Sequence, residues 1–174
     1  MKTRVLSALL LAAALAASQA LAQTPAPNPL DVIPDAMPFN APYGAPISLE
    51  RAQAVVNAGV AECKKRGWMM NLAVVDSGGN LVAFARMDGS QLASVELAQH
   101  KARTAVNFRR DTKIFETNVQ NGLVYQMTLD GMIASRGGIP LVEGGKIIGA
   151  VGASGGAGAQ DEVCSKAGAA LINR

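Results

Sequence analysis

The sequence is poor in the side chains that most often bind metals or stack on nucleic-acid bases. Its 174 residues include one histidine, two cysteines and one tryptophan, and aromatic residues make up only 4% of the chain. A single histidine with two distant cysteines does not give the ligand spacing of a structural zinc site. The sequence also lacks a basic stripe with interleaved aromatic residues, so it indicates no nucleic-acid partner.

The first 22 residues have the three regions of a secretory signal peptide. Lys2 and Arg4 precede an apolar run over residues 5–17, and Ala20-Leu21-Ala22 then matches an A-x-A cleavage site. We expect cleavage after Ala22, export to the periplasm or the medium, and no membrane span. Removing the two basic residues lowers the net charge from +3 to +1, so part of the apparent basicity belongs to the cleaved segment.

Residues 23–46 form a proline-rich leader that holds all but one of the eight prolines. Segments of this composition favour extended backbone over a packed core. The leader still carries apolar side chains that a neighbouring subunit could cover: Ile33, Met37, Phe39 and Tyr43. We therefore expect an extended leader followed by one domain over residues 47–174.

The only two cysteines, Cys63 and Cys164, allow two interpretations. In an oxidising compartment an even count favours a disulfide, since both residues could lie on helices packed against one sheet. Alternatively, both are small buried hydrophobic residues. The number of cysteines does not decide between these interpretations, because disulfide formation depends on geometry.

Periodicity and end signals predict the elements of the domain. A helix is expected from Ser48, an N-cap candidate, to the basic residues before Gly67, and another from about Leu92 to Phe108. Between them, apolar runs over 70–75 and 81–86 flank a glycine-containing loop and predict a hairpin.

The rest of the chain predicts a second hairpin and three further segments. Asp111 or Thr112 can cap a short helix that ends near Asn118. Residues 121–136 are expected to form a loop with one short strand. Apolar runs over 139–142 and 147–151 meet across Gly144-Gly145, a turn that favours a hairpin. A glycine-rich loop over 152–158 leads into a helix from about Ala159 to Ile172. The predicted strand over 147–151 is rich in small residues, which is typical of a strand that another backbone or a ligand approaches closely.

This order of helices and hairpins predicts an α+β domain with a mainly antiparallel sheet covered by helices. Three other functions fit the sequence poorly. Gly152 to Gly156 matches G-x-S-x-G, but a hydrolase nucleophile needs its histidine later in the chain, and His100 precedes it. The same loop lacks the lysine of a P-loop, and the acids Asp161 and Glu162 would repel phosphate there. Those two acids could bind a hard cation, although acids at a helix start are mostly caps.

His100 and Lys101 are the candidate functional residues of the second predicted helix. On a helical wheel His100 lies nearly opposite the apolar face, with Glu96 one turn before it. Such a histidine is either simply solvated or free to bind iron. Lys101 lies at the edge of the apolar face, where an ammonium group needs a partner, and Asp76 or Asp88 are the expected ones.

Three stretches together resemble the GlcG/HbpS family, a haem-degrading-type domain similar to the C-terminal domain of PduO-type proteins. They are VVDSGGNLVAFARMDGS over residues 74–90, KARTA over 101–105, and GGIPLVEGGKIIGAVGASGGAGAQDEVCSKAG over 137–168. The resemblance covers nearly all of the domain. It implies a profilin-like α/β/α sandwich with a five-stranded sheet, homo-oligomers that include octamers, and extracytoplasmic haem binding.

With this resemblance, the leading hypothesis is an exported haem-binding protein that promotes haem degradation or iron handling. His100 is the expected ligand of the haem iron, and the other expected contacts are Glu96, Lys101, Arg103 and Thr104. Arg109 is a further candidate for the propionates, and Met87 a further candidate for the iron. Two alternatives stay open: a small-molecule enzyme or accessory protein that uses the glycine-rich loop and Lys101, and an oligomeric scaffold without catalysis.

Overall fold

The computed structural model describes residue 28 and residues 31–37, 39 and 41–173. The predicted signal peptide and its cleavage site lie outside the described residues. The chain divides into two compact units, Met1–Pro38 and Phe39–Arg174. In the first unit the described apolar side chains, among them Ile33 and Met37, are exposed.

All of the helices and strands named below lie in the second unit, and the described part of the first unit has only one residue in 3-10 conformation, Asp31. In chain order the elements are α2 (Leu49–Lys65), β1 (Asn71–Asp76), β2 (Leu81–Arg86), α3 (Ala93–Asn107), α4 (Lys113–Gln120), the 3-10 helix η2 (Val124–Thr128), β3 (Gly138–Glu143), β4 (Lys146–Ser154) and α5 (Gly158–Ala169). Both predicted hairpins and all four predicted α-helices are confirmed to within a few residues.

The ends of α2 follow from local chemistry. The Ser48 hydroxyl accepts a hydrogen bond from the Arg51 N–H at 3.4 Å, which caps the first turn. Glu50 lies in the first turn, and Lys64 and Lys65 lie in the last one, where each charge complements the helix dipole.

The sheet has four antiparallel strands in the order β2-β1-β4-β3, so the expected fifth strand is absent from the described residues. Instead, the end of the leader lies beside β4. Tyr43 forms a single parallel bridge with Ile147, and Ile47 donates its N–H to the Ile148 carbonyl at 2.9 Å. The pairing stays this short because Pro42 and Pro46 have no N–H to donate to a longer ladder. The last residues of the leader thus contact the sheet, although none of residues 41–46 is buried.

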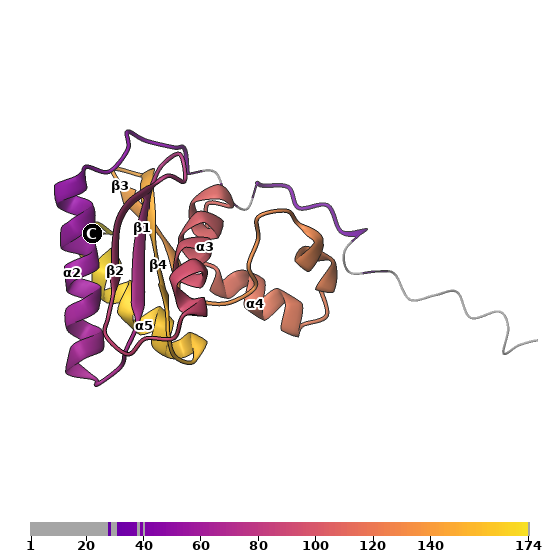
Figure 1. The fold of residues 1–174 in the computed structure, drawn as a ribbon. Helices are drawn as coiled ribbons and strands as arrows, with labels where there is room; N and C mark the ends of the chain where they lie inside the picture. The colour runs from indigo at the N-terminus through magenta and orange to yellow at the C-terminus, as the bar shows by residue number, and fades with distance from the viewer. Residues whose placement is uncertain (1–27, 29–30, 38, 40, 174) are drawn as a thin grey trace, which may run out of the picture. The chain divides into compact units, whose positions relative to one another are not determined.

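Helices cover both faces of the sheet and make three layers (Figure 1). Helices α2 and α5 share one core with one face, built from residues such as Val56, Leu72 and Val151. Helix α3 packs on the opposite face, where Ala102, Ala105 and Val106 meet the strands. This arrangement agrees with the expected α/β/α layering.

Small residues on β3 and β4 bring α3 unusually close to the sheet. A Cβ atom added to Gly152 would lie 2.1 Å from the carbonyl oxygen of Ala98, and one added to Gly138 would lie 2.2 Å from that of Lys101. The glycine-rich strand is therefore approached by another backbone, which was one of the two interpretations of its small residues.

Cys63 of α2 and Cys164 of α5 form a disulfide, with their Cα atoms 5.7 Å apart. Both cysteines are fully buried, so the bond joins the two helices inside their shared core. This settles the alternatives left open by the sequence.

The segment between α4 and β3 contains no strand, contrary to expectation. Residues Val124–Thr128 form the 3-10 helix η2, and residues 129–137 are irregular. The Asn118 side-chain amide donates to the Gln126 side-chain oxygen at 3.2 Å, and this bond attaches the start of the segment to α4. At its end Arg136 donates two hydrogen bonds to Glu116, from its backbone N–H at 2.8 Å and its Nε at 2.6 Å.

Candidate functional site

A hollow of about 350 Å³ follows the outer face of α3. Its lining residues are Glu96, Leu97, His100, Arg103 and Asn107 from α3, with Gly131 from the irregular segment. The α3 residues recur at helical spacing, so they form one continuous stripe along the helix. Three of the five predicted binding residues therefore meet at one place: Glu96, His100 and Arg103.

His100 is partly exposed in this hollow. Within the described chain its ring makes no hydrogen bond, so both nitrogens are available to an added ligand. Arg103 donates to the Gln99 side chain at 3.2 Å, which holds its guanidinium group beside the hollow. The hollow thus combines an imidazole, a carboxylate and a guanidinium group with the apolar Leu97.

Thr104 does not line the hollow, contrary to the predicted contact, because it lies on the buried side of α3. Its hydroxyl donates to the Gly131 carbonyl and accepts from the Ile133 N–H, both at 3.1 Å. These bonds attach the irregular segment to α3, and Gly131 forms the wall of the hollow. Thr104 therefore positions the wall instead of contacting a ligand.

Lys101 also points away from the hollow, and neither expected partner, Asp76 or Asp88, contacts it. Its ammonium nitrogen lies 2.7 Å from a carboxylate oxygen of Asp161, and both side chains are only 3% exposed. Asp76 instead accepts the N–H groups of Gly78 and Asn80 in its own loop, which together help to keep its pKa low against the effect of burial.

Asp161 joins Lys101 to the glycine-rich loop. Its second carboxylate oxygen accepts the Gly156 N–H at 3.0 Å. Burial raises the pKa of Asp161 more than the charge and hydrogen bond of Lys101 and the loop N–H groups lower it. The alternative small-molecule hypothesis assigned Lys101 and the glycine-rich loop to a ligand. Asp161 is instead bonded to Lys101 and to one N–H group of that loop.

Ser154, the central residue of the G-x-S-x-G match, is not an activated nucleophile. Its buried hydroxyl donates to the Ser94 hydroxyl at 3.1 Å and has no histidine partner within the described chain. The structure therefore agrees with the sequence in excluding a serine hydrolase of this type.

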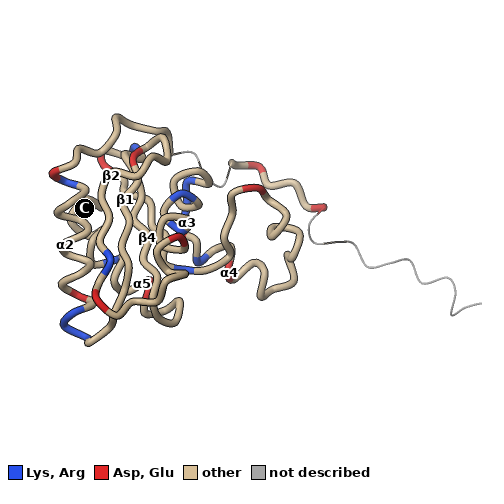
Figure 2. Tube along the Cα trace, in the orientation of Figure 1, with Lys and Arg blue, Asp and Glu red and all other residues tan. Residues whose placement is uncertain are grey.

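Basic residues lie along α3 and just after it (Figure 2). Arg109 does not line the hollow but donates to the Ala41 carbonyl at 3.4 Å. Arg110 stacks over the Phe39 ring, 3.1 Å from its centroid, and burial together with the charge of Arg109 lowers its pKa. Both arginines thus hold the end of the leader, and only Arg103 remains beside the hollow.

Sequence reasoning missed three lining residues. Leu97 and Asn107 could have been predicted from the sequence, because a helical wheel of α3 places them on the same face as His100. Gly131 has no such signal, because it comes from an irregular segment that reaches α3 only through Thr104.

Among the described residues no group of three or more His, Cys, Asp and Glu side chains is placed to hold a metal ion. The described helices also include none that is long and apolar enough to cross a membrane. The hollow beside α3 therefore depends on a single imidazole for any metal contact.

The fold and the hollow define a small α+β domain in which helices enclose an antiparallel sheet and one helix lines an open hollow. The chain belongs to the family described as haem degrading protein HbpS-like, whose family model matches residues 47–170. The resemblance inferred from the three sequence stretches is thereby confirmed.

Two curated relatives are similar over most of the domain. Protein GlcG of Escherichia coli (strain K12) is 43% identical over 108 residues, which cover 62% of this chain and 81% of GlcG. An uncharacterized 15.0 kDa protein of Citrobacter freundii is 33% identical over 124 residues, which cover 69% of this chain and 87% of that protein.

Solved structures of similar fold include two with names related to haem. A double mutant of HbpS from Streptomyces reticuli has a TM-score of 0.70 at 28% identity, with 86% of this chain and all of that chain covered. PduOC in complex with haem has a TM-score of 0.67 at 28% identity, with 74% and 96% covered. ORFY of Klebsiella pneumoniae has a TM-score of 0.70 at 25% identity, with 82% and 97% covered.

Proposed function

We propose that this protein is exported and binds haem in the hollow beside His100. The observation that carries the proposal is that the chain's only histidine lies, with both ring nitrogens free, in a hollow beside Arg103. The haem complex of PduOC, a structure of the same fold at 28% identity, supports the choice of ligand.

The side chains of the hollow fit the parts of a haem. An imidazole nitrogen is a common axial ligand of haem iron, and a guanidinium group suits a propionate. Glu96 lies one turn from His100, where its carboxylate could accept from the second ring nitrogen and raise the basicity of the imidazole. Bound haem would supply the iron on which haem degradation or iron handling depends.

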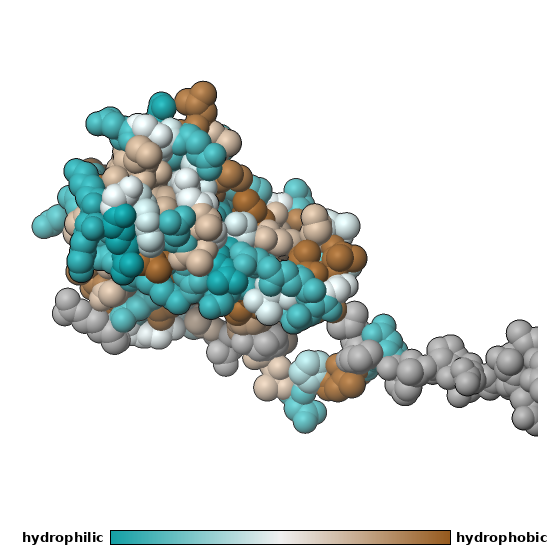
Figure 3. All heavy atoms as spheres, turned by 90° about the horizontal axis from the view of Figure 1, so that it is seen from below, coloured by the Kyte–Doolittle hydropathy of each residue, from teal (hydrophilic) through white to brown (hydrophobic). Residues whose placement is uncertain are grey.

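The hollow is too open to enclose a porphyrin by itself. Its volume of about 350 Å³ is near the lower end for small-molecule sites. We propose that a second copy supplies the other wall. Exposed apolar side chains lie on the segment that ends at Gly131: Val124, Tyr125, Met127 and Leu129. Hydrophobic residues also lie among hydrophilic ones on the face of the molecule shown in Figure 3.

The alternative small-molecule function through Lys101 and the glycine-rich loop has less support, since Asp161 engages both. An oligomeric scaffold without a ligand predicts no response to haem. Haem titration therefore separates the proposed function from this alternative.

The test is titration of the mature chain with haemin, followed in the Soret region. We expect saturable binding, and His100→Ala should shift the Soret band and weaken binding by about tenfold or more because an iron ligand is lost. Asn57→Ala, which changes an exposed residue of α2, is the matched control and should behave as the unchanged chain.

The oligomeric mass of each variant is measured in parallel, so that loss of assembly is not mistaken for loss of a ligand. An identical spectrum and affinity for His100→Ala would show that the iron is bound by a residue other than His100. The candidate Met87 does not line this hollow, and its sulfur accepts the Met70 N–H at 3.5 Å. Haemin binding no better than that of an unrelated protein would refute the haem proposal.

A further inference from the structure

A second hollow, here called the tryptophan hollow, shares no lining residue with the hollow beside His100. Its volume is about 290 Å³, and three separate segments line it. They are residues 67–70 before β1, Gly89 and Gln91 after β2, and Gly155, Gly156 and Gln160 around the start of α5. The hollow is thus made by tertiary contact of segments far apart in the chain.

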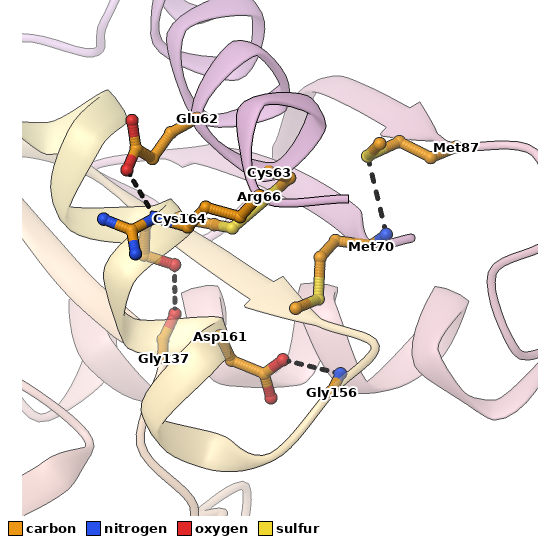
Figure 4. The surroundings of a disulfide bond; sticks show 10 residues. Glu62, Cys63, Arg66, Met70, Met87, Gly137, Gly156, Asp161 and Cys164 are labelled. Atoms are coloured by element: carbon orange, nitrogen blue, oxygen red, sulfur yellow. Dashed lines mark hydrogen bonds and ion pairs between the residues drawn. A yellow bond between two sulfur atoms is a disulfide. The ribbon is translucent and has the colours of Figure 1, made fainter. Parts of the chain in front are cut away.

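Glycines of the tryptophan hollow allow two methionine side chains to pack closely against the backbone. A Cβ atom added to Gly89 would lie 2.7 Å from the Met69 sulfur, and one added to Gly155 would lie 2.8 Å from the Met70 sulfur. Figure 4 shows the Met70 side chain extending from the residue before β1 toward the glycine-rich loop. A larger residue at either position would clash with the methionine sulfur, so both glycines permit this close packing. Of the two methionines only Met69, which is 55% exposed, is accessible to a ligand, because Met70 is buried.

The lining offers no charged side chain to a ligand. The Gly156 N–H is also occupied, because it donates to Asp161, as the dashed line in Figure 4 marks. The Arg66 guanidinium lies over the Trp68 ring, 5.2 Å from its centroid, but it is already paired with Glu62 at 2.6 Å. A phosphate or carboxylate would therefore lose its hydration without gaining an unpaired cation or this loop amide. The hollow suits a neutral molecule.

Hydrogen-bond donors remain free at the tryptophan hollow. Gln160 accepts the Ala157 N–H through Oε1 at 2.9 Å, which leaves its Nε2 without a partner in the described chain. The indole N–H of Trp68 likewise donates no hydrogen bond within the described residues. These donors call for an acceptor such as a carbonyl oxygen or a ring nitrogen.

We propose that the tryptophan hollow binds a small neutral heteroaromatic molecule. Its ring would contact the Trp68 indole and the exposed thioether of Met69, since sulfur and aromatic groups attract one another. Its carbonyl or ring nitrogen would accept from Gln160 or Trp68. The small volume limits the ligand to one or two rings.

Trp68 is the only tryptophan of the chain, so its fluorescence reports directly on this hollow. The probe is nicotinamide, a neutral one-ring heteroaromatic amide. We expect a saturable change in tryptophan emission. Nicotinate, which has the same ring with a carboxylate, should bind about tenfold more weakly because it carries a charge.

Two variants locate the binding. Gln160→Leu removes the free amide, and Met69→Ala removes a thioether that is 55% exposed and so contributes little to folding. Each should weaken nicotinamide binding by about fivefold or more. Gln53→Leu, at an exposed glutamine of α2, and His100→Ala should both retain the affinity of the unchanged chain.

Emission that falls linearly with nicotinamide concentration, without saturation, would overturn the proposal, because it indicates only collisional quenching. Saturable binding that both Gln160→Leu and Met69→Ala leave unchanged would overturn it as well. A loss of affinity in His100→Ala would assign the binding to the other hollow. Because haemin is absent throughout, these outcomes do not depend on the proposed haem function.

Discussion

His100 and Lys101 are adjacent in the chain but have opposite environments. His100 faces the open hollow, whereas Lys101 is buried against Asp161 of α5. Thr104, one turn further on, is buried as well and holds the Gly131 wall. The same helix therefore presents ligand-binding groups on one side and uses buried polar groups on the other to join separate segments.

At the residue scale we predict that Lys101→Met destabilises the fold strongly. The substitution leaves the Asp161 carboxylate buried without its cation, and breaking one partner of a buried pair typically costs about 3–5 kcal/mol. Denaturant unfolding followed by circular dichroism measures the change. Asp161→Asn in the Lys101→Met background should recover part of the loss, since it removes the unpaired charge.

Two results would contradict this view of Lys101. One is a free energy of unfolding for Lys101→Met within about 0.5 kcal/mol of the unchanged chain. The other is a double variant that is no more stable than the single one, because it would show that the buried charge is not the cause.

At the element scale, Glu162 near the start of α5 connects three segments. Its side chain is 7% exposed and pairs with Lys166 of α5, Lys113 of α4 and Arg136 of the irregular segment. Burial alone would raise the pKa of Glu162, but the Lys166 hydrogen bond and the three positive charges together hold it below its ordinary value. Deprotonated Glu162 therefore favours the folded state.

We predict that this network makes the domain sensitive to acid. Because the folded-state pKa of Glu162 is lowered, its contribution is complete above the unfolded-state pKa and is lost as the pH falls through the folded-state value. Urea unfolding curves at decreasing pH measure this effect. Compared with the unchanged chain, Glu162→Gln should have a lower free energy of unfolding at neutral pH, and this free energy should fall less steeply as the pH decreases.

Asp88→Asn is the control for this series, since Asp88 is exposed and has no ion pair among the described residues. Its stability should follow that of the unchanged chain at every pH. Equal slopes for Glu162→Gln and the unchanged chain would mean that other groups cause the acid sensitivity.

At the scale of the whole molecule, the second unit has three layers and a disulfide that joins two helices of one layer. Its surface still exposes large apolar side chains on the segment after α4, and such groups are costly to leave in water. A symmetric homo-oligomer would cover them.

We predict that the exported protein begins at Gln23 and forms an oligomer larger than a dimer. Intact mass of the protein from its host and light scattering at micromolar concentration measure the two properties. Tyr125→Glu with Met127→Glu places charges on the exposed segment and should lower the scattering mass. Leu92→Glu, an exposed apolar residue outside that segment, is the comparison.

A full-length chain that keeps its first 22 residues would contradict export, and a scattering mass near that of one mature chain would contradict assembly. If the oligomer persists in the glutamate variants, the segment after α4 is not the interface.

Local patterns in the sequence determined most elements of this protein. The cap at Ser48, the Gly144-Gly145 turn and the apolar periodicities predicted the helices and hairpins, because each depends on residues close in the chain. His100, Glu96 and Arg103 also followed from one helical face. The expected fifth strand and the short strand within 121–136 were wrong, since pairing at a sheet edge depends on which segments reach it.

Only the tertiary structure decided which distant residues meet. Lys101 pairs with Asp161 because α3 and the start of α5 meet at the end of β4, and no periodicity in the sequence encodes that distance. The same holds for the Cys63–Cys164 disulfide, the Gly131 wall and the hollow around Trp68. Each is formed by segments far apart in the chain, and their relative placement is set by packing against the sheet.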